Sequence, residues 1–124
     1  MTLGVRDTLK IVGRYELTEG DARNEGRFED AIGIFPEFID GYGVLVLPSS
    51  GRYFQVPYGA LVPRNIKNLL AAGRSIRDKI SHASVRNMMC CTVSGQGAGV
   101  AVATSSRMAC KPARSTSTTS RRPW

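Results

Sequence analysis

The stretch "TVSGQGAGVAVA", residues 92–103, carries three glycines at alternate positions and then continues into small apolar residues. Gly95, Gly97 and Gly99 each lower the stability of a helix by about 1 kcal/mol relative to alanine. Such a cost is offset where a backbone without Cβ atoms lets a ligand or another element come into van der Waals contact. The stretch therefore predicts either a helix that begins against a ligand or a helix that packs tightly on a strand.

Length and composition limit the class of protein. The chain has 124 residues, of which 42% are hydrophobic, which is enough for one domain with a core. It has no apolar run of the roughly eighteen residues that a membrane span needs, and its first residues lack the layout of a secretory signal. The three cysteines, with Cys90 and Cys91 adjacent, suit small buried side chains better than a disulfide or a zinc site. We expect a cytoplasmic protein without a metal site.

The net charge of +7 is concentrated at the C-terminal end. Residues 107–124 hold five of the seventeen basic residues and none of the ten acidic ones. This segment is rich in Ser, Thr and Arg, without aromatic or apolar periodicity, and predicts a disordered or aberrant tail. The alternative is a small basic, non-catalytic binding protein that uses its tail on nucleic acid or an anionic surface. We favour the first interpretation and do not expect nucleic acid as a partner.

The N-terminal half predicts short strands and turns. "TEGD" places Thr18 and Asp21 at the spacing of a capping box. "RFEDAIGIFPEFID", residues 27–40, suits either a short helix or a short strand, since Gly33 and Pro36 interrupt it. Alternating or continuous apolar residues predict three further strands, the last two joined by the turn "PSSG": 8–18, 43–47 and 52–57.

The C-terminal half predicts a strand followed by one or two helices. The apolar run Leu69–Ala72, ended by Gly73, suits a strand buried on both faces. The long stretch from Ser84 to Met108 suits helix. Its predicted apolar side, with the two methionines assigned to the core, consists of Val85, Met88, Met89, Val93, Val100 and Val102.

Two features of this half together suggest an anionic ligand. Gly73 and Arg74 stand at the end of the predicted strand, and an arginine is a planar donor for phosphate or carboxylate. The glycine stretch would open a helix, whose free N–H groups and positive dipole end attract an anion. A nucleotide-type cofactor between the two would suit both. The alternative, a helix packed on a strand through small residues, remains open on these grounds.

Several separated motifs resemble one family. "GVRDTLKIVGRYELT" (4–18), "FEDAIG" (28–33), "GRYFQVPYGALVPRNIKNLLAAGRS" (51–75) and "SVRNMMCCTVSGQGAGVA" (84–101) occur in the order found in the C-terminal part of FAD-dependent oxidoreductases. The resemblance covers about residues 3–106 and stops after Ser106. Gly97 stands where the family usually has alanine, and Met89 where it usually has proline.

The resemblance implies FAD as the cofactor. Gly73 and Arg74 match the family's motif near the ribityl and pyrophosphate portion, and Ser84 matches a residue near the flavin. The helix-start motif, which faces the pyrimidine edge of the flavin, corresponds to Gly95, Gln96, Gly97, Ala98 and Gly99. A valine at Gly97 or Gly99 is then expected to harm cofactor binding more than folding.

Three residues are candidates for catalysis. Arg86 belongs to the family's "SIR" motif near the possible substrate, and Arg6 matches an arginine that would bind an anion. His82, the single histidine, is a candidate general base. For Arg6 the alternative is a solvated or salt-bridged surface residue, and for His82 a structural one. The substrate, a small molecule, is not readable from the sequence.

The resemblance also implies a fold and a domain organisation. The fold class is α/β, here an α+β fragment: the C-terminal portion of a two-domain FAD-dependent oxidoreductase, with short strands followed by cofactor-facing helices. The family's N-terminal ADP-binding unit carries the fingerprint G-x-G-x-x-G, which this sequence lacks. We therefore predict a fragment, inactive alone, whose partner is the missing N-terminal portion. Its divisions are a substrate or interdomain region (1–66), part of the FAD-binding domain (67–106) and the tail (107–124).

Overall fold

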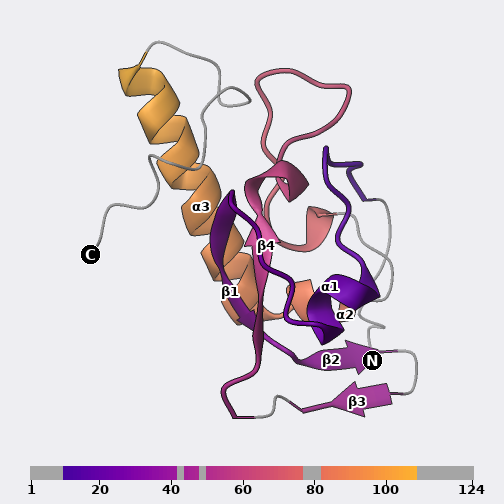
Figure 1. The fold of residues 1–124 in the computed structure, drawn as a ribbon. Helices are drawn as coiled ribbons and strands as arrows, with labels where there is room; N and C mark the ends of the chain where they lie inside the picture. The colour runs from indigo at the N-terminus through magenta and orange to yellow at the C-terminus, as the bar shows by residue number, and fades with distance from the viewer. Residues whose placement is uncertain (1–9, 42–43, 48–49, 77–81, 109–124) are drawn as a thin grey trace, which may run out of the picture.

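The computed structural model describes residues 10–41, 44–47, 50–76 and 82–108 of the chain (Figure 1). These ranges form an α+β fold of short strands and helices, as the sequence predicted. In chain order the elements are α1 (Glu19–Arg23), β1 (Ala31–Pro36), β2 (Ile39–Gly41), β3 (Val44–Val46), β4 (Tyr53–Pro57), the 3₁₀ turns η1 (Tyr58–Ala60) and η2 (Gly73–Ser75), α2 (His82–Val85) and α3 (Met88–Arg107).

The described strands form two small antiparallel sheets. β1 pairs with β4, and β2 pairs with β3. The strands predicted at 43–47 and 52–57 are therefore present as β3 and β4, but they belong to different sheets. The ambiguous segment 27–40 contains strands β1 and β2 rather than a helix. In β1 the register shifts between Ala31 and Gly33, so Ile32 is an extra residue opposite β4.

Helix α1 begins at the predicted capping box. The Thr18 hydroxyl accepts a hydrogen bond from the Asp21 N–H at 3.2 Å, and the Asp21 carboxylate accepts one from the Thr18 N–H at 2.8 Å. The same carboxylate oxygen accepts a bond from the Tyr15 hydroxyl at 3.1 Å. Each of these two backbone N–H groups, which would otherwise be unpaired at the helix start, thus bonds to the side chain of the other residue. The bond from Tyr15 joins the start of α1 to the preceding chain.

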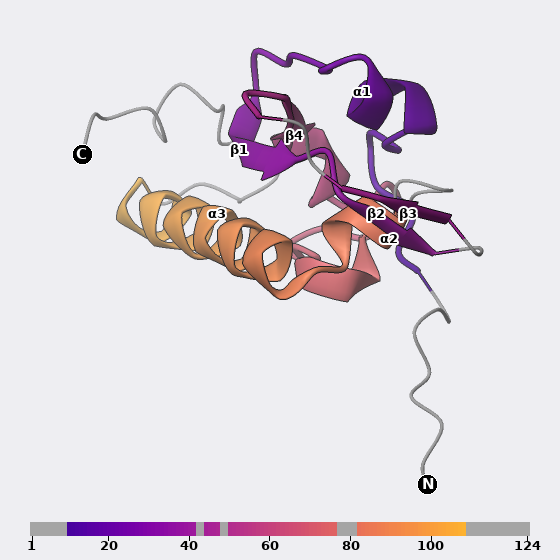
Figure 2. The same ribbon diagram turned by 90° about the horizontal axis from the view of Figure 1, so that it is seen from below.

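The core lies around the β1–β4 sheet. Phe35 and Phe54, partners in the strand pairing, are fully buried and pack edge to face with ring centroids 5.8 Å apart. α3 runs along one side of β1 and β4, and α1 lies on another side (Figure 2). The buried residues of this cluster come from every part of the described chain: Leu17, Ala22, Phe35, Phe54, Val56, Ala60, Leu61, Ile76, Val85 and Cys90.

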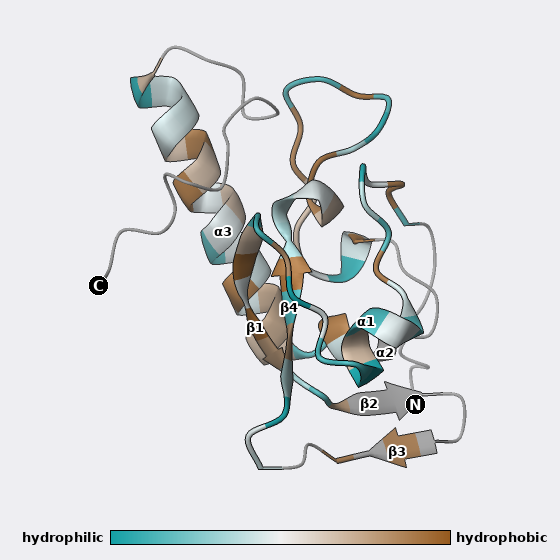
Figure 3. Cartoon of the chain, in the orientation of Figure 1, coloured by the Kyte–Doolittle hydropathy of each residue, from teal (hydrophilic) through white to brown (hydrophobic). Residues whose placement is uncertain are grey.

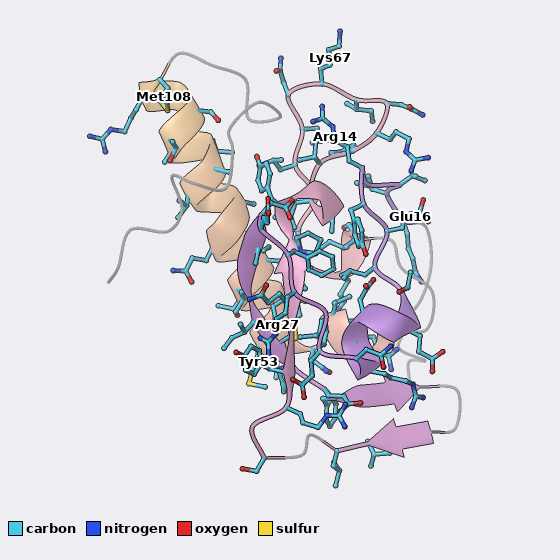
Figure 4. All side chains as sticks on the ribbon, viewed as in Figure 1. Arg14, Glu16, Arg27, Tyr53, Lys67 and Met108 are labelled. Carbon is cyan, nitrogen blue, oxygen red and sulfur yellow. The ribbon has the colours of Figure 1, made fainter. Side chains whose placement is uncertain are left out.

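Polar contacts join α1 to the edge of the sheet. The Arg52 guanidinium donates a hydrogen bond to the backbone oxygen of Arg23 at 2.6 Å and lies 3.0 Å from a Glu37 carboxylate oxygen. Arg27 stacks 3.9 Å above the ring of Tyr53 in β4 (Figure 4). Arg52 and Arg27 therefore have structural roles, and neither belongs to the candidate site described below.

Two predicted strands are wrong. Of residues 8–18, the described part from residue 10 makes only isolated bridges, one parallel between Ile11 and Ile76 and one antiparallel between Gly13 and Pro63. Residues 69–72 are irregular, and Leu69 is 40% exposed rather than buried on both faces. Residues in the left-handed region, Asn68 at φ +60° and Gly73 at φ +68°, turn the backbone on both sides of this short run. It therefore cannot continue as an extended strand.

Candidate cofactor site

The glycine stretch lies inside α3 and not at its start. α3 begins at Met88, about two turns before Gly95. The prediction that Gly95–Gly99 opens the helix is therefore wrong in this respect. Within a helix each backbone N–H beyond the first turn bonds to the carbonyl four residues earlier. The N–H groups of the glycines are used by the helix itself, and only the first turn of α3 presents free ones.

One face of α3, here called the packed face, lies against β1. A Cβ on Gly97 would be 3.1 Å from the Cβ of Ile32, and a Cβ on Gly33 would overlap Cγ1 of Val93. Each element thus supplies a glycine that receives a β-branched side chain of the other. Neighbouring residues of a regular strand face opposite sides, but the bulge in β1 lets both Ile32 and Gly33 meet α3. The alternative of close helix–strand packing is therefore correct for Gly97.

The opposite side of α3, here called the open face, is exposed. Within the described part of the chain, a Cβ on Gly95 or on Gly99 would meet no atom of another element within 4 Å. The open face also carries Met88 and Met89, which are 81% and 66% exposed. Its members are Met88, Met89, Thr92, Gly95, Gln96, Gly99, Val100, Val102, Ala103 and Ser106.

The predicted apolar side of the helix is therefore wrong for four of its six residues. Val85 is buried and Val93 is half-buried, but the two methionines, Val100 and Val102 are exposed. The fully buried positions of α3 are instead small: Cys90, Ser94, Ala101 and Ser105. Small side chains at these positions let α3 pack closely on β1, and Val93 fits against Gly33. In Figure 3 α3 is coloured white to brown over most of its length, with teal at a few places.

Several predicted residues meet where η2 contacts the first turns of α3, a place here called the η2–α3 junction. The Gly73 N–H donates a hydrogen bond to the Ser94 hydroxyl at 2.9 Å. A Cβ on Gly73 would lie 3.5 Å from the Cys91 sulfur. The Arg74 Nε donates to the backbone oxygen of Arg86 at 3.4 Å, and the Cys91 thiol donates to the same oxygen at 3.5 Å. The junction consists of Gly73, Arg74, Arg86, Cys91 and Ser94.

The helix geometry connects this junction to the open face. Cys91, Gly95 and Gly99 follow one another at four-residue intervals, so they lie along one side of α3. A Cβ on Gly73 would meet Cys91, whereas a Cβ on Gly95 or Gly99 would meet no other element among the described residues. The line of Cys91, Gly95 and Gly99 thus leads from the junction onto the exposed side of α3.

The N-terminus of α3 has no side-chain cap. Asn87 makes no capping bond to the helix, and its Nδ2 donates to the Ser84 carbonyl oxygen at 3.1 Å instead. Ser84 is fully buried, and its hydroxyl has no hydrogen-bond partner in the described part of the chain. The donor set at this end is thus a free helix terminus with a partial positive charge and one hydroxyl.

The other predicted residues fall outside this arrangement. Ala98 packs against the core cluster, and Gln96 is exposed on the open face. Arg6 lies outside the described residues. His82 is the first residue of α2, but its side chain is outside what the structure describes. Sequence reasoning missed Ser94 and Cys91 as members of the junction, and a serine next to a glycine stretch carries no signal for such a role.

Burial strongly raises the pKa of one cysteine thiol among the described residues. Burial, and then the neighbouring Cys91, raise the pKa of Cys90 from 9.0 to about 12. The Cys90 thiol is therefore neutral at physiological pH and unsuited to act as a nucleophile. Cys90 is a small buried side chain on the packed face, as the sequence predicted.

The described ranges contain neither a metal-binding cluster nor a membrane-spanning helix. No cluster of three or more His, Cys, Asp or Glu side chains there is arranged to hold a metal ion. None of the helices described is both long and apolar enough to cross a membrane.

Comparison with known proteins identifies the family. No curated protein and no solved structure matches the chain. A family model, "FAD dependent oxidoreductase", matches residues 1–119. The match extends past Ser106, where the sequence resemblance was expected to stop, and includes much of the basic tail. It covers nearly the whole chain, and the chain therefore belongs to the FAD-dependent oxidoreductase family, whose cofactor is FAD.

Proposed function

We propose that the chain is the C-terminal part of an FAD-dependent oxidoreductase that transfers hydride between a small-molecule substrate and the flavin. The observation that carries the proposal, beyond the family match, is the open face of α3. Its glycines cost the helix stability without making a contact in the described chain. We assign residues 67–106 to the FAD-binding domain, residues 1–66 to the substrate or interdomain region, and 107–124 to a tail.

The residues of the candidate site fit FAD. Gly95 and Gly99 leave a surface free of Cβ atoms, on which a flat ring system has room. The uncapped first turn of α3 supplies N–H donors and a positive dipole end for carbonyl oxygens or phosphate. Gly73 and Arg74 stand beside it, and Ser84 has a hydroxyl to donate. Gly97 and Ala98 support this surface from behind through packing.

When bound, FAD supplies the two-electron redox chemistry. The contribution of this chain is to bind the cofactor and to hold it in place. A helix N-terminus directed at a site where negative charge collects stabilises that charge. The first turn of α3 therefore favours the reduced state of the bound cofactor, and Arg74 anchors its anionic portion.

Three residues are proposed to bind the substrate or to transfer its proton. Arg86 is half-buried, and its backbone oxygen accepts bonds from Arg74 and Cys91, so its Cα is fixed beside the junction. We propose that Arg86 and Arg6 bind an anionic group of the substrate, and that His82 moves a proton. The proposals for Arg86 and Arg6 follow from the family motifs, and that for His82 follows from its being the single histidine of the sequence.

The exposed apolar residues support a further protein partner. α3 has no charged residue between Met88 and Ser106, although a solvent-facing helix side is ordinarily polar. Contiguous apolar surface of this kind marks an interaction site. We propose that the ADP-binding unit of the same protein covers the part of the open face that FAD leaves free.

The experiment compares two forms of the protein. One is the 124-residue chain, and the other is the protein produced from the complete coding frame, including any upstream sequence. We expect the complete protein to carry FAD with a resolved visible flavin spectrum, and the 124-residue chain to bind FAD weakly and to be marginally stable. Tight stoichiometric FAD binding by the 124-residue chain contradicts the fragment proposal. A complete protein that never binds FAD contradicts the function itself.

A further inference from the structure

Ser94 uses its hydroxyl fully at the η2–α3 junction. Its side chain lies on the packed face and is 1% exposed. The hydroxyl oxygen accepts a hydrogen bond from the Gly73 N–H at 2.9 Å and donates one to the carbonyl oxygen of Cys91 at 3.0 Å. Both roles of the hydroxyl are therefore occupied, and Ser94 links a backbone group of η2 to the first turns of α3.

Of the hydrogen bonds in the described part of the chain, one joins the backbone of η2 to a side chain of α3, and it is the bond to Ser94. Gly73 adopts φ +68°, which favours glycine, and a Cβ at this position would lie 3.5 Å from the Cys91 sulfur. Arg74 is exposed, and its Nε donates a long hydrogen bond of 3.4 Å to the backbone oxygen of Arg86. The bond to Ser94 fixes the backbone N–H at the start of η2, whereas the Ser75 oxygen at its end accepts a bond from the Ile11 N–H at 2.9 Å.

We propose that Ser94 is a positioning residue for FAD, which holds Gly73 and Arg74 at the place where they bind the cofactor. The inference rests on the proposed function of the site. Ser94 does not itself contact the cofactor, because it is buried beneath η2. Loss of its hydroxyl frees the Gly73 N–H and lets η2 move relative to α3, so the cofactor must pay the cost of ordering this segment.

The chain offers a matched control on the same helix. Ser105 is also buried, at 2% exposed, and its hydroxyl has no hydrogen-bond partner among the residues that the structure describes. Ser105→Ala therefore removes a buried hydroxyl from α3 without breaking a described bond. Ser94→Thr keeps a hydroxyl that can bond to the carbonyl three residues earlier, and serves as the conservative rescue.

The test measures two quantities in the complete protein. The first is the dissociation constant for FAD, by titration of the apoprotein. The second is the hydrogen-exchange rate of the Gly73 amide without cofactor. For Ser94→Ala we expect FAD to bind about tenfold more weakly, as the loss of one hydrogen bond produces, and the Gly73 amide to exchange faster. Ser94→Thr and Ser105→Ala are expected to stay within about twofold of the wild type in FAD binding, well below the effect of losing one hydrogen bond.

Each other outcome has a definite meaning. If Ser94→Ala exchanges faster at Gly73 but binds FAD as tightly as the wild type, Ser94 is only structural and the inference is overturned. It is overturned equally if Ser105→Ala weakens FAD binding as much as Ser94→Ala. If the wild-type complete protein does not bind FAD, the proposed function fails, and this inference fails with it.

Discussion

Gly97 and Gly99 are separated by one residue on α3, yet they lie in opposite environments. At Gly97 an added Cβ would be 3.1 Å from Ile32, so the absence of a side chain is what lets the helix approach β1. At Gly99, as at Gly95, an added Cβ would meet none of the residues that the structure describes within 4 Å. The contact with β1 thus explains why a glycine stands at position 97. No contact within the described chain explains the glycines of the open face. The structural reason for a glycine in a helix therefore depends on the residue that lies opposite that glycine, even when two glycines are close in sequence.

An added side chain should lower the unfolding free energy more at the packed face than at the open face. The largest loss is expected at Gly33, the residue of β1 that meets the packed face. Gly33→Ala places a Cβ on Cγ1 of Val93, a β-branched side chain that is stiff at χ1. Overpacking of this kind costs about 1–3 kcal/mol of unfolding free energy, and each kcal/mol lowers the melting temperature by roughly 2–8 °C, less for a larger domain. Thermal unfolding of the complete protein without FAD measures it.

A second variant checks that the contact itself is responsible. Val93→Ala makes room for the new methyl group, so the double variant Gly33→Ala with Val93→Ala should lose less stability than the sum of the two single variants. A coupling of about 0.5–3 kcal/mol is typical of residues in contact. Simple additivity would show that Gly33 and Val93 do not meet.

The buried thiol of the packed face predicts a dependence on alkaline pH. The pKa of Cys90 is raised from 9.0 to about 12 in the folded protein. A group that holds its proton more tightly when folded contributes stability that is fully present below pH 9 and is lost as the pH rises toward 12. We expect the free energy of unfolding to fall by up to about 1.4 kcal/mol per pH unit in this window.

Denaturant titrations from pH 8 to pH 11 measure this slope, with Cys90→Ala as the comparison. The alanine variant lowers stability at pH 8 by loss of packing, but it should show a shallower decline above pH 9. The same decline in both proteins would assign the pH dependence to other groups, such as Tyr15, whose pKa is also raised, first by burial and then by its bond to Asp21.

The open face predicts a small effect of the opposite sign. Gly95→Ala and Gly99→Ala should each raise the unfolding free energy of the cofactor-free protein by about 0.5–1 kcal/mol, because alanine is the better helix former and the new Cβ meets nothing. Gly97→Ala is the matched control, since its Cβ meets Ile32 and the gain is offset. Equal gains at Gly97 and Gly99 would erase the distinction between the two faces.

The parts of the fold that the sequence predicted correctly depend on neighbouring residues. The capping box of Thr18 and Asp21 needs only a spacing of three residues and is present as predicted. The helical segment from Ser84 to Met108 is likewise present, as α2 and α3. Strands 43–47 and 52–57 were recognised, but their pairing with β2 and β1 depends on contacts distant in the chain.

The parts that were wrong depend on what lies opposite. Hydrophobicity assigned Met88 and Met89 to the core, whereas the buried positions of α3 are small residues, and the bulge at Ile32 lets both Ile32 and Gly33 meet the helix. No feature of the sequence reveals that bulge. The family motif located Gly73 and Arg74, but the hydroxyl that holds Gly73 comes from Ser94, whose role appears only in three dimensions.

The most direct test of the account compares Gly99→Val with Gly97→Val in the complete protein, by melting temperature without cofactor and by FAD content. For Gly97→Val we expect a lower melting temperature, because the valine is pushed against Ile32. For Gly99→Val we expect an unchanged melting temperature without cofactor and a loss of bound FAD. Normal FAD content in Gly99→Val, or a melting temperature lowered as far as in Gly97→Val, would contradict the claim that the open face is kept clear for the cofactor.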